Sequence, residues 1–166
     1  PSLIQRAIDL NPNLPALAQK YHGHNDMFFI GRNVDYAASM EGSLKLKEIS
    51  YLHSEAYAAG ELKHGTIALI EKDRPVIALA CYEALFDKMM SNIKEVKARG
   101  AQVLAVVLEG QIFAEADDVI FVPRTEALFN SLPEIVPLQL FAYYVARANG
   151  CDIDKPKNLA KSVTVE

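Results

Sequence analysis

The sequence predicts an α/β fold in which a parallel sheet is covered by helices on both faces, a three-layer α/β/α sandwich. Short, uninterrupted apolar runs of strand length recur along the chain, as in "PVIALA" (75–80) and "QVLAVVLE" (102–109). Such runs are typical of strands that are buried on both faces. The amphipathic segment "EALFDKMMSNIKEVKARG" separates these two runs. Alternation of buried strands with helices indicates the doubly wound class.

Two short helices are expected at the N-terminus, over about residues 1–22. Their apolar residues follow a helical period that an Asn-Pro pair interrupts once. The run "MFFIGR" (27–32) predicts the first buried strand. A helix of about eighteen residues should follow it, with Asp35 as the N-cap, because an aspartate accepts hydrogen bonds from the free N–H groups of a helix N-terminus. The stretch "SEAY" (54–57) is then a possible second strand.

The second half of the chain repeats this alternation. The helix between the two central apolar runs closes on Gly100 with basic residues in its last turn, which suits the helix dipole and a glycine C-cap. "DVIFVP" (118–123) predicts the last strand. A final helix is expected over about 132–149, ending at Gly150.

Ligands of doubly wound sheets bind at the carboxyl ends of the strands, so the residues just after each strand matter most. These are Gly31 and Arg32 after the first strand, and residues 80–83 after the third. A phosphate site needs a turn rich in Ser, Thr or Gly with free backbone N–H groups. The third strand offers a carboxylate instead, and no GxGxxG or Walker sequence occurs in the chain. No good phosphate cradle is therefore predicted.

Composition narrows the class of protein. A chain of 166 residues is about the size of one domain and can bury a core without disulfides. The net charge of −4 gives no basic footprint, which argues against a nucleic-acid or anionic-membrane partner. The apolar runs are far too short to span a bilayer, and no signal peptide is visible. Two cysteines without CxxC spacing fit a reducing cytoplasm.

Three charged residues of the helix after the first strand share one face. Glu41, Lys45 and Glu48 are spaced i, i+4 and i+7. A solvated stripe with one ion pair is the usual explanation of such a pattern. Apolar neighbours, including Met40 and Leu44, suggest instead that the helix is buried on more than one side, which would make these carboxylates candidates for proton transfer.

The histidines give weaker signals. His64 follows Glu61 by three residues, so a carboxylate could orient its ring, although a lone loop histidine is usually structural or exposed. His22 and His24 have no third ligand nearby, and we expect no metal site. His53 is expected to pack within the helix.

The C-terminal stretch "NLAKSVTVE" raises the question of one lysine. If the segment is extended, Lys161 shares a face with Leu159, Val163 and Val165. A lysine in that position either snorkels to the surface, the commoner case, or sits where burial depresses its pKa. The pattern alone leaves both open.

Three stretches resemble one family closely. They are "EGSLKLKEISYLHSEAYAAGELKHGTIALI" (41–70), "VPLQLFAYYVARANGCDIDKP" (136–156) and the terminal "NLAKSVTVE". They look like the C-terminal sugar isomerase (SIS) domain of glutamine–fructose-6-phosphate aminotransferase, also called glucosamine-6-phosphate synthase. The resemblance extends over essentially the whole chain, and its motifs are far more specific than a generic sugar isomerase fold. Lys157, where the family often has Arg, and Thr66, where many members have Pro, are departures that remove no catalytic group.

The resemblance implies roles for six residues. In that family the lysine matching Lys161 opens the sugar and forms a Schiff base with its C2 carbonyl, and the glutamate matching Glu48 moves a proton between C1 and C2. The histidine matching His64 assists ring opening from across a dimer. The residues that line the same site match Glu41, Lys45 and Ala160.

The resemblance also implies a fold and partners. The expected sheet has five parallel strands in flavodoxin-like order, within a single SIS domain (1–150) that is followed by an extended tail (151–166). The substrate and product would be fructose 6-phosphate and glucosamine 6-phosphate, with no cofactor. A homodimer in the cytoplasm is expected.

The family's N-terminal glutaminase domain and first SIS domain have no counterpart in these 166 residues. We therefore expect a fragment that does not turn over substrate alone. The alternative is a non-catalytic module that binds sugar phosphate or dimerises. A deglycase or another sugar-phosphate isomerase of the same superfamily is a further possibility that the terminal motif disfavours.

Overall fold

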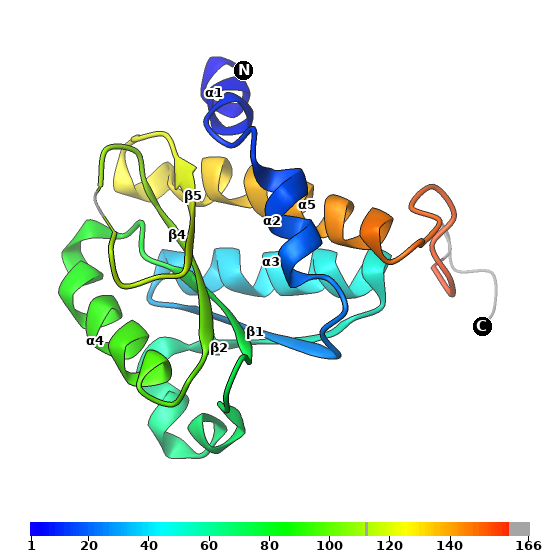
Figure 1. Cartoon of the computed structure of the whole chain (residues 1–166). Helices are drawn as coiled ribbons and strands as arrows, with labels where there is room; N and C mark the ends of the chain where they lie inside the picture. The colour runs from blue at the N-terminus through cyan, green and yellow to red at the C-terminus, as the bar shows by residue number, and fades with distance from the viewer. Residues whose placement is uncertain (112, 160–166) are drawn as a thin grey trace, which may run out of the picture.

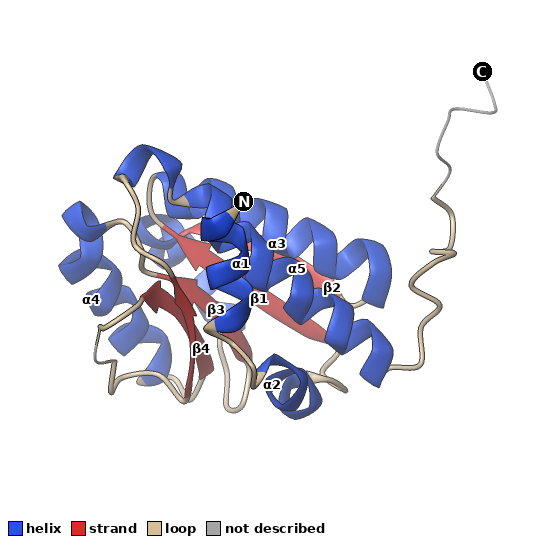
Figure 2. Cartoon of the chain, turned by 90° about the horizontal axis from the view of Figure 1, so that it is seen from above, coloured by secondary structure: helices blue, strands red, loops and turns tan. Residues whose placement is uncertain are grey.

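A five-stranded parallel sheet lies between two layers of helices in the computed structural model, which describes residues 1–111 and 113–159 (Figures 1 and 2). The strands are β1 (Asp26–Gly31), β2 (His53–Ala58), β3 (Pro75–Leu79), β4 (Gln102–Leu108) and β5 (Asp118–Val122). Their spatial order is β2-β1-β3-β4-β5, and every neighbouring pair is parallel. The predicted fold class and flavodoxin-like order are confirmed.

Helices cover both faces of this sheet. They are α1 (Ser2–Asp9), α2 (Leu14–Tyr21), α3 (Val34–Ser50), α4 (Phe86–Lys97) and α5 (Ser131–Ala148). Four short 3₁₀ helices are η1 (Ala59–His64), η2 (Thr66–Leu69), η3 (Glu83–Leu85) and η4 (Ala127–Phe129). Residues of α2, α3 and α5 pack on one face of the sheet, while α4, η1 and η2 pack on the other. Among the described residues, no helix is long and apolar enough to cross a membrane.

The strands bury side chains on both faces because successive residues point in opposite directions. In β1, Met27 and Phe29 belong to the core under α2, α3 and α5. Phe28 and Ile30 belong to the second core, under α4. This two-sided burial explains why the strands appear in the sequence as continuous apolar runs rather than alternating ones.

Two glycines let α3 lie close to its neighbours. A Cβ on Gly31 would stand 2.5 Å from the carbonyl carbon of Asp35, so α3 begins directly over the end of β1. A Cβ on Gly42 would stand 2.9 Å from Leu138 Cδ1 and 3.0 Å from Phe29 Cε1. The helix is thus held tightly between the sheet and α5.

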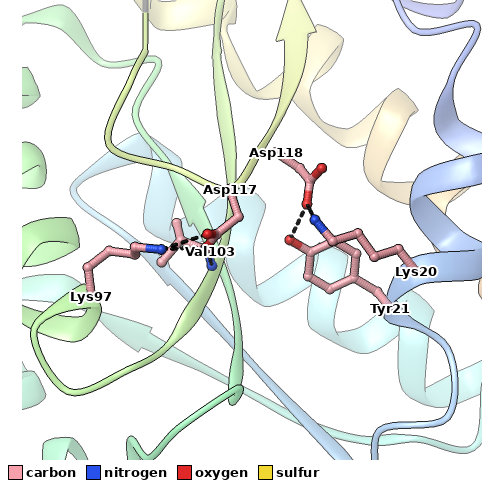
Figure 3. A network of polar contacts seen from close by, with 6 residues as sticks. All are labelled: Lys20, Tyr21, Lys97, Val103, Asp117 and Asp118. Carbon is pink, nitrogen blue, oxygen red and sulfur yellow. Dashed lines mark hydrogen bonds and ion pairs between the residues drawn. The ribbon is translucent and has the colours of Figure 1, made fainter.

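Polar side chains tie helices to β5 from both sides (Figure 3). Asp118 accepts hydrogen bonds from Tyr21 Oη at 2.9 Å and from Lys20 Nζ at 2.5 Å, both at the end of α2. Asp117 accepts from Lys97 Nζ of α4 and from the Val103 N–H, each at 2.7 Å. Burial raises the pKa of Tyr21, and its hydrogen bond to Asp118 adds to the rise, so the phenol stays neutral. Two adjacent aspartates therefore fix both helical layers to one strand.

Asn11 covers the outer edge of β5. Its side-chain N–H₂ donates to the Phe121 carbonyl at 2.7 Å, and its Oδ1 accepts from the Phe121 N–H at 2.9 Å. The same N–H₂ group donates to the Ala7 carbonyl of α1 at 2.8 Å. The amide thus makes the two hydrogen bonds that a residue of a further strand would make.

Three expectations are wrong in detail. Asp35 is not the N-cap, because α3 already begins at Val34 after Asn33, whose φ is 56°. Met40 and Leu44 are 47% and 43% exposed, so α3 is buried on fewer sides than their apolar character suggests. The His53 prediction also fails, because the helix ends at Ser50 and this residue opens β2 with an exposed side chain.

Candidate active site on helix α3

Glu41, Lys45 and Glu48 form one charged cluster on the surface of α3, as their spacing predicts. Lys45 Nζ lies 2.7 Å from Glu48 Oε2 and 3.6 Å from Glu41 Oε1. The three side chains are 29 to 33% exposed, so each is partly shielded from water but open to a ligand. We call these three residues the α3 cluster.

Lys45 is the permanent cation of the α3 cluster. The hydrogen bond to Glu48 raises the pKa of Lys45, and the charges of both glutamates add to the rise. A lysine that forms a Schiff base must be neutral when it attacks. Lys45 is therefore suited to orient the two carboxylates or to hold an anionic group, and the amine must come from elsewhere.

Hydroxyl groups hold the opposite side of α3 in place. The Ser43 and Ser54 hydroxyls are 2.9 Å apart, and Ser54 Oγ also donates to the Ser43 carbonyl at 2.8 Å. All of these atoms are buried between α3 and β2. This contact fixes the rotation of α3 about its axis, and hence the outward direction of the α3 cluster.

His64 lies apart from the α3 cluster. It ends η1, its side chain is 76% exposed, and its Nε2 lies 3.8 Å from Glu61 Oε2, the carboxylate that the sequence paired with it. Within the described residues no hydrogen bond or ion pair joins His64 to the α3 cluster. One copy of the chain therefore does not bring these predicted site residues together.

The described part of the C-terminal tail passes the end of α3. The Lys157 N–H donates to Tyr51 Oη at 2.8 Å, and Lys157 Nζ lies 5.1 Å from the centre of the Tyr51 ring. Tyr51 follows α3 directly, three residues after Glu48. Ala160 and Lys161 lie outside the described residues. The tail that carries them thus departs from a point close to the α3 cluster.

The loop after β3 offers no free phosphate cradle. The backbone N–H groups of its second and third residues, Cys81 and Tyr82, both donate to Asp35 Oδ2, at 2.9 and 3.0 Å. A carboxylate of the protein thus takes the donors that an anion would need at this switch in strand order. The carboxylate that takes these donors is Asp35 of α3, whereas Glu83, the carboxylate that the sequence places after β3, pairs with Arg124.

A second acidic group, which sequence inspection missed, lies behind this loop. Glu134 of α5 is 0% exposed and Asp35 is 2% exposed. Desolvation raises the pKa of both carboxyl groups, and the charge of Asp35 adds to the rise at Glu134. One sequence signal was available: Glu134 is the only acidic residue in the eighteen of α5, and prolines and apolar residues surround it.

A shallow hollow of about 310 Å³ lies between α3 and β2, on a side of α3 that faces away from the α3 cluster. Its lining includes Met40, Ser43 and Lys47 of α3 and Glu55 and Tyr57 of β2. None of the three cluster residues lines it. The candidate site is therefore an open face of the helix rather than a closed pocket within the described residues.

Comparison with known proteins assigns the chain to a family. The family model of the SIS domain matches residues 20–147. Glutamine–fructose-6-phosphate aminotransferase [isomerizing] of Clostridium tetani is 54% identical over 168 residues, which cover all of this chain and 28% of that protein. The enzyme of the same name from Thermus thermophilus is 49% identical over the same share of each chain. The chain thus spans less than a third of the length of these relatives.

Solved structures agree with this assignment. The C-terminal domain of glucosamine-fructose-6-phosphate aminotransferase from Francisella tularensis is 36% identical, with a TM-score of 0.84 over 93% of this chain and 44% of that chain. Tagatose-6-phosphate ketose/aldose isomerase from Escherichia coli has a TM-score of 0.80 at 15% identity, over 99% of this chain and 46% of that chain, and so shares the fold. The chain therefore belongs to the SIS domain family and matches the C-terminal part of glutamine–fructose-6-phosphate aminotransferase.

Proposed function

We propose that this chain supplies the isomerase half-site of an enzyme that makes glucosamine 6-phosphate and glutamate from fructose 6-phosphate and glutamine. The observation that supports it most is the α3 cluster: Glu48 is held 2.7 Å from a permanent cation on an open helix face. The tail leads from Tyr51, at the end of that helix, toward Lys161. Isomerisation needs a carboxylate that can move a proton between two adjacent carbons, and Glu48 is placed to approach a ligand on this face.

Lys161 is the proposed nucleophile. Its neutral amine adds to the C2 carbonyl of the open-chain sugar, and loss of water gives the imine. Ammonia released from glutamine then replaces the lysine at C2. Glu48 takes a proton from C1 and returns it to C2, which converts the ketose derivative into the aldose. Lys45 and Glu41 orient Glu48, and Ala160 contacts the sugar.

The proposed site is completed by other parts of the protein. The phosphate would be held by the first SIS domain, because Asp35 already occupies the donor groups of the β3 loop in this domain. The glutaminase domain would release the ammonia. His64, which is strongly exposed and apart from the α3 cluster, would serve the site of the second subunit in a homodimer. We place the enzyme in the cytoplasm.

Borohydride trapping in the full-length enzyme tests the Schiff base. Reduction in the presence of fructose 6-phosphate should attach the sugar to Lys161, as peptide mass spectrometry would show. Lys161→Ala should abolish labelling, whereas the matched variant Lys157→Ala should keep it. Sugar phosphate that binds without labelling Lys161 would favour the alternative, a binding or dimerisation module without chemistry.

Mixing variants tests the shared site. A His64→Ala enzyme and a Lys161→Ala enzyme should each be inactive. After subunit exchange, each heterodimer should regain up to about half of the wild-type activity, because one of its two sites then has both residues. An equal mixture, in which about half of the dimers are heterodimers, should regain up to about a quarter. Absence of any recovery, with exchange verified by mass, would place both residues in a site formed by one subunit.

A further inference from the structure

Two carboxyl groups and one thiol behind the β3 loop form a buried cluster that the proposed reaction does not use. Asp35 comes from α3, Glu134 from α5, and Cys81 from the loop after β3. Their exposed fractions are 2%, 0% and 0%. The Glu134 carboxyl is near enough to the Asp35 carboxyl and the Cys81 thiol for each to affect the pKa of the other, while the thiol itself donates to the Val106 carbonyl. Three separate elements thus meet at these side chains.

The hydrogen bonds of this group do not balance if both carboxyls are ionised. Asp35 Oδ2 accepts from two backbone N–H groups, but Asp35 Oδ1 and both oxygens of Glu134 have no donor. Carboxylate oxygens only accept hydrogen bonds, so two ionised groups facing each other leave all three atoms unpaired. Buried polar atoms without partners are rare and costly in native proteins. A proton on one carboxyl supplies a donor that pairs two of these three atoms.

We propose that Asp35 and Glu134 share one proton at neutral pH, and that the resulting hydrogen bond joins α3, α5 and the β3 loop. Glu134 is the acid that carries the proton. Asp35 has two N–H donors that stabilise its anion, whereas Glu134 has none. The Glu134 hydroxyl therefore donates to Asp35 Oδ1.

The groups around Asp35 and Glu134 favour a proton, rather than a bound cation, between the two carboxyls. From α5, Asn130 donates to the Cys81 carbonyl at 3.2 Å and leaves its own oxygen without a partner. From the β3 loop, the Cys81 thiol is neutral, because burial raises its pKa. In the part of the chain that the structure describes, no lysine or arginine pairs with Asp35 or Glu134. Within residues 1–111 and 113–159, no three His, Cys, Asp or Glu side chains are placed to hold a metal ion.

The proton makes the fold sensitive to alkaline pH. In the unfolded chain Glu134 ionises near the ordinary glutamate pKa of about 4.3, whereas in the fold burial and the Asp35 anion keep it protonated far above that value. Above about pH 4.3 the folded chain thus holds one more proton than the unfolded chain. The unfolding equilibrium constant should rise about tenfold per pH unit until Glu134 ionises in the fold as well.

Equilibrium unfolding in urea from about pH 6 to about pH 8, with the variant Glu134→Gln, tests this inference. Glutamine keeps the shape and can donate its N–H₂ to Asp35, but it cannot ionise. The pH slope of the unfolding constant should be about tenfold per unit smaller in Glu134→Gln than in the wild type. Glu126→Gln, an exposed glutamate just before η4, is the matched control and should keep the wild-type slope. Equal slopes in the wild type and Glu134→Gln would overturn the proposal.

Infrared spectroscopy gives a second test that does not depend on how the variants fold. The wild-type chain at neutral pH should show the carbonyl band of a neutral carboxylic acid, which Glu126→Gln keeps and Glu134→Gln lacks. Asp35→Asn removes the neighbouring anion, so the band should disappear at lower pH than in the wild type. Absence of the band from the wild type would disprove the shared proton. Neither experiment measures turnover, so the outcome is independent of the proposed aminotransferase role.

Discussion

Helix α3 contacts two acidic groups whose surroundings differ in every respect that matters for charge. At its N-terminal end, Asp35 faces Glu134 in the core and accepts from two backbone N–H groups, and neither carboxyl is paired with a cation among the described residues. Further along, Glu41 and Glu48 flank Lys45 at the surface and are about one-third exposed. Burial favours neutral acids, whereas a cation and water favour ionised ones.

The two sets of acidic residues on this helix have different roles, one structural and one proposed to be chemical. The buried pair has no ready access to a ligand, so we assign it to holding α3 in place. The α3 cluster is partly open to solvent and contains a cation, and the described part of the C-terminal tail contacts Tyr51, three residues beyond Glu48. Residue type alone does not distinguish these roles, because each group contains carboxylates of the same helix.

Glu48→Gln should have the largest effect, and it acts on activity. Without a titrating carboxylate, proton transfer between C1 and C2 should slow about 10²- to 10⁴-fold in the full-length enzyme. The free energy of unfolding should change by less than about 1 kcal/mol, because the ion pair with Lys45 is partly solvated. Steady-state kinetics and urea unfolding measure both. Lys47→Gln changes an exposed neighbour and is the control. A fully active Glu48→Gln enzyme would show that another base transfers the proton.

Glu134→Ala should have the opposite profile, with its main effect on stability. Removal of a fully buried side chain leaves a cavity and an unpaired oxygen on Asp35, which together should lower the free energy of unfolding by about 3 kcal/mol. Glu134→Gln should lose much less at neutral pH. The urea midpoints of Glu134→Ala and Glu134→Gln, measured side by side, test this difference in stability. Equal midpoints for the two variants would contradict it.

Gly42→Ala tests how tightly α3 is held between the two acidic groups. The new Cβ would stand within 3.0 Å of Leu138 Cδ1 and Phe29 Cε1, so these tightly packed side chains must move or α3 must shift away from them. Overpacking of this kind should lower the free energy of unfolding by about 1 to 3 kcal/mol. Thermal unfolding measures it, with Gly23→Ala as a contrast: its Cβ would meet no atom, and only its φ of 83° opposes the change.

Lys45→Gln should have the smallest effect on stability. The two ion pairs of Lys45 are exposed enough that their loss should change the free energy of unfolding by less than about 1 kcal/mol. The small contribution of these ion pairs to the free energy of unfolding should weaken further as salt is added. A loss of several kcal/mol in urea unfolding would show that the α3 cluster is structural and would remove the contrast with the buried pair.

Much of the fold could be predicted from the sequence because its strands are buried on both faces. The continuous run of β4, for example, reflects packing against helices on each side, and this pattern is visible without the structure. The helical spacing of the α3 cluster also follows directly from residue numbers. Its role as a site still rests on resemblance, and the placement of Lys161 and Ala160 lies outside the described residues.

Other features depend on contacts between distant residues, which the sequence does not reveal. Asp35 is a residue type that often caps a helix, and it lies near the start of α3. Its carboxylate nevertheless accepts hydrogen bonds from the backbone N–H groups of residues 81 and 82, because α3 begins directly over the end of β1. Glu134 is separated from Asp35 by about a hundred residues, so no local pattern links them. Met40 is apolar but 47% exposed, because it borders an open hollow between α3 and β2 instead of packing in either core.

The side chain of Asn11 has a consequence for how the chain behaves at high concentration. An edge strand with free main-chain groups is a template on which a strand of another molecule can align, the first step toward fibrillar aggregation. By occupying both main-chain groups of Phe121, the fourth of the five residues of β5, Asn11 closes this part of the β5 edge with a single amide. The N-terminal helices thereby protect the sheet from self-association as well as covering its core.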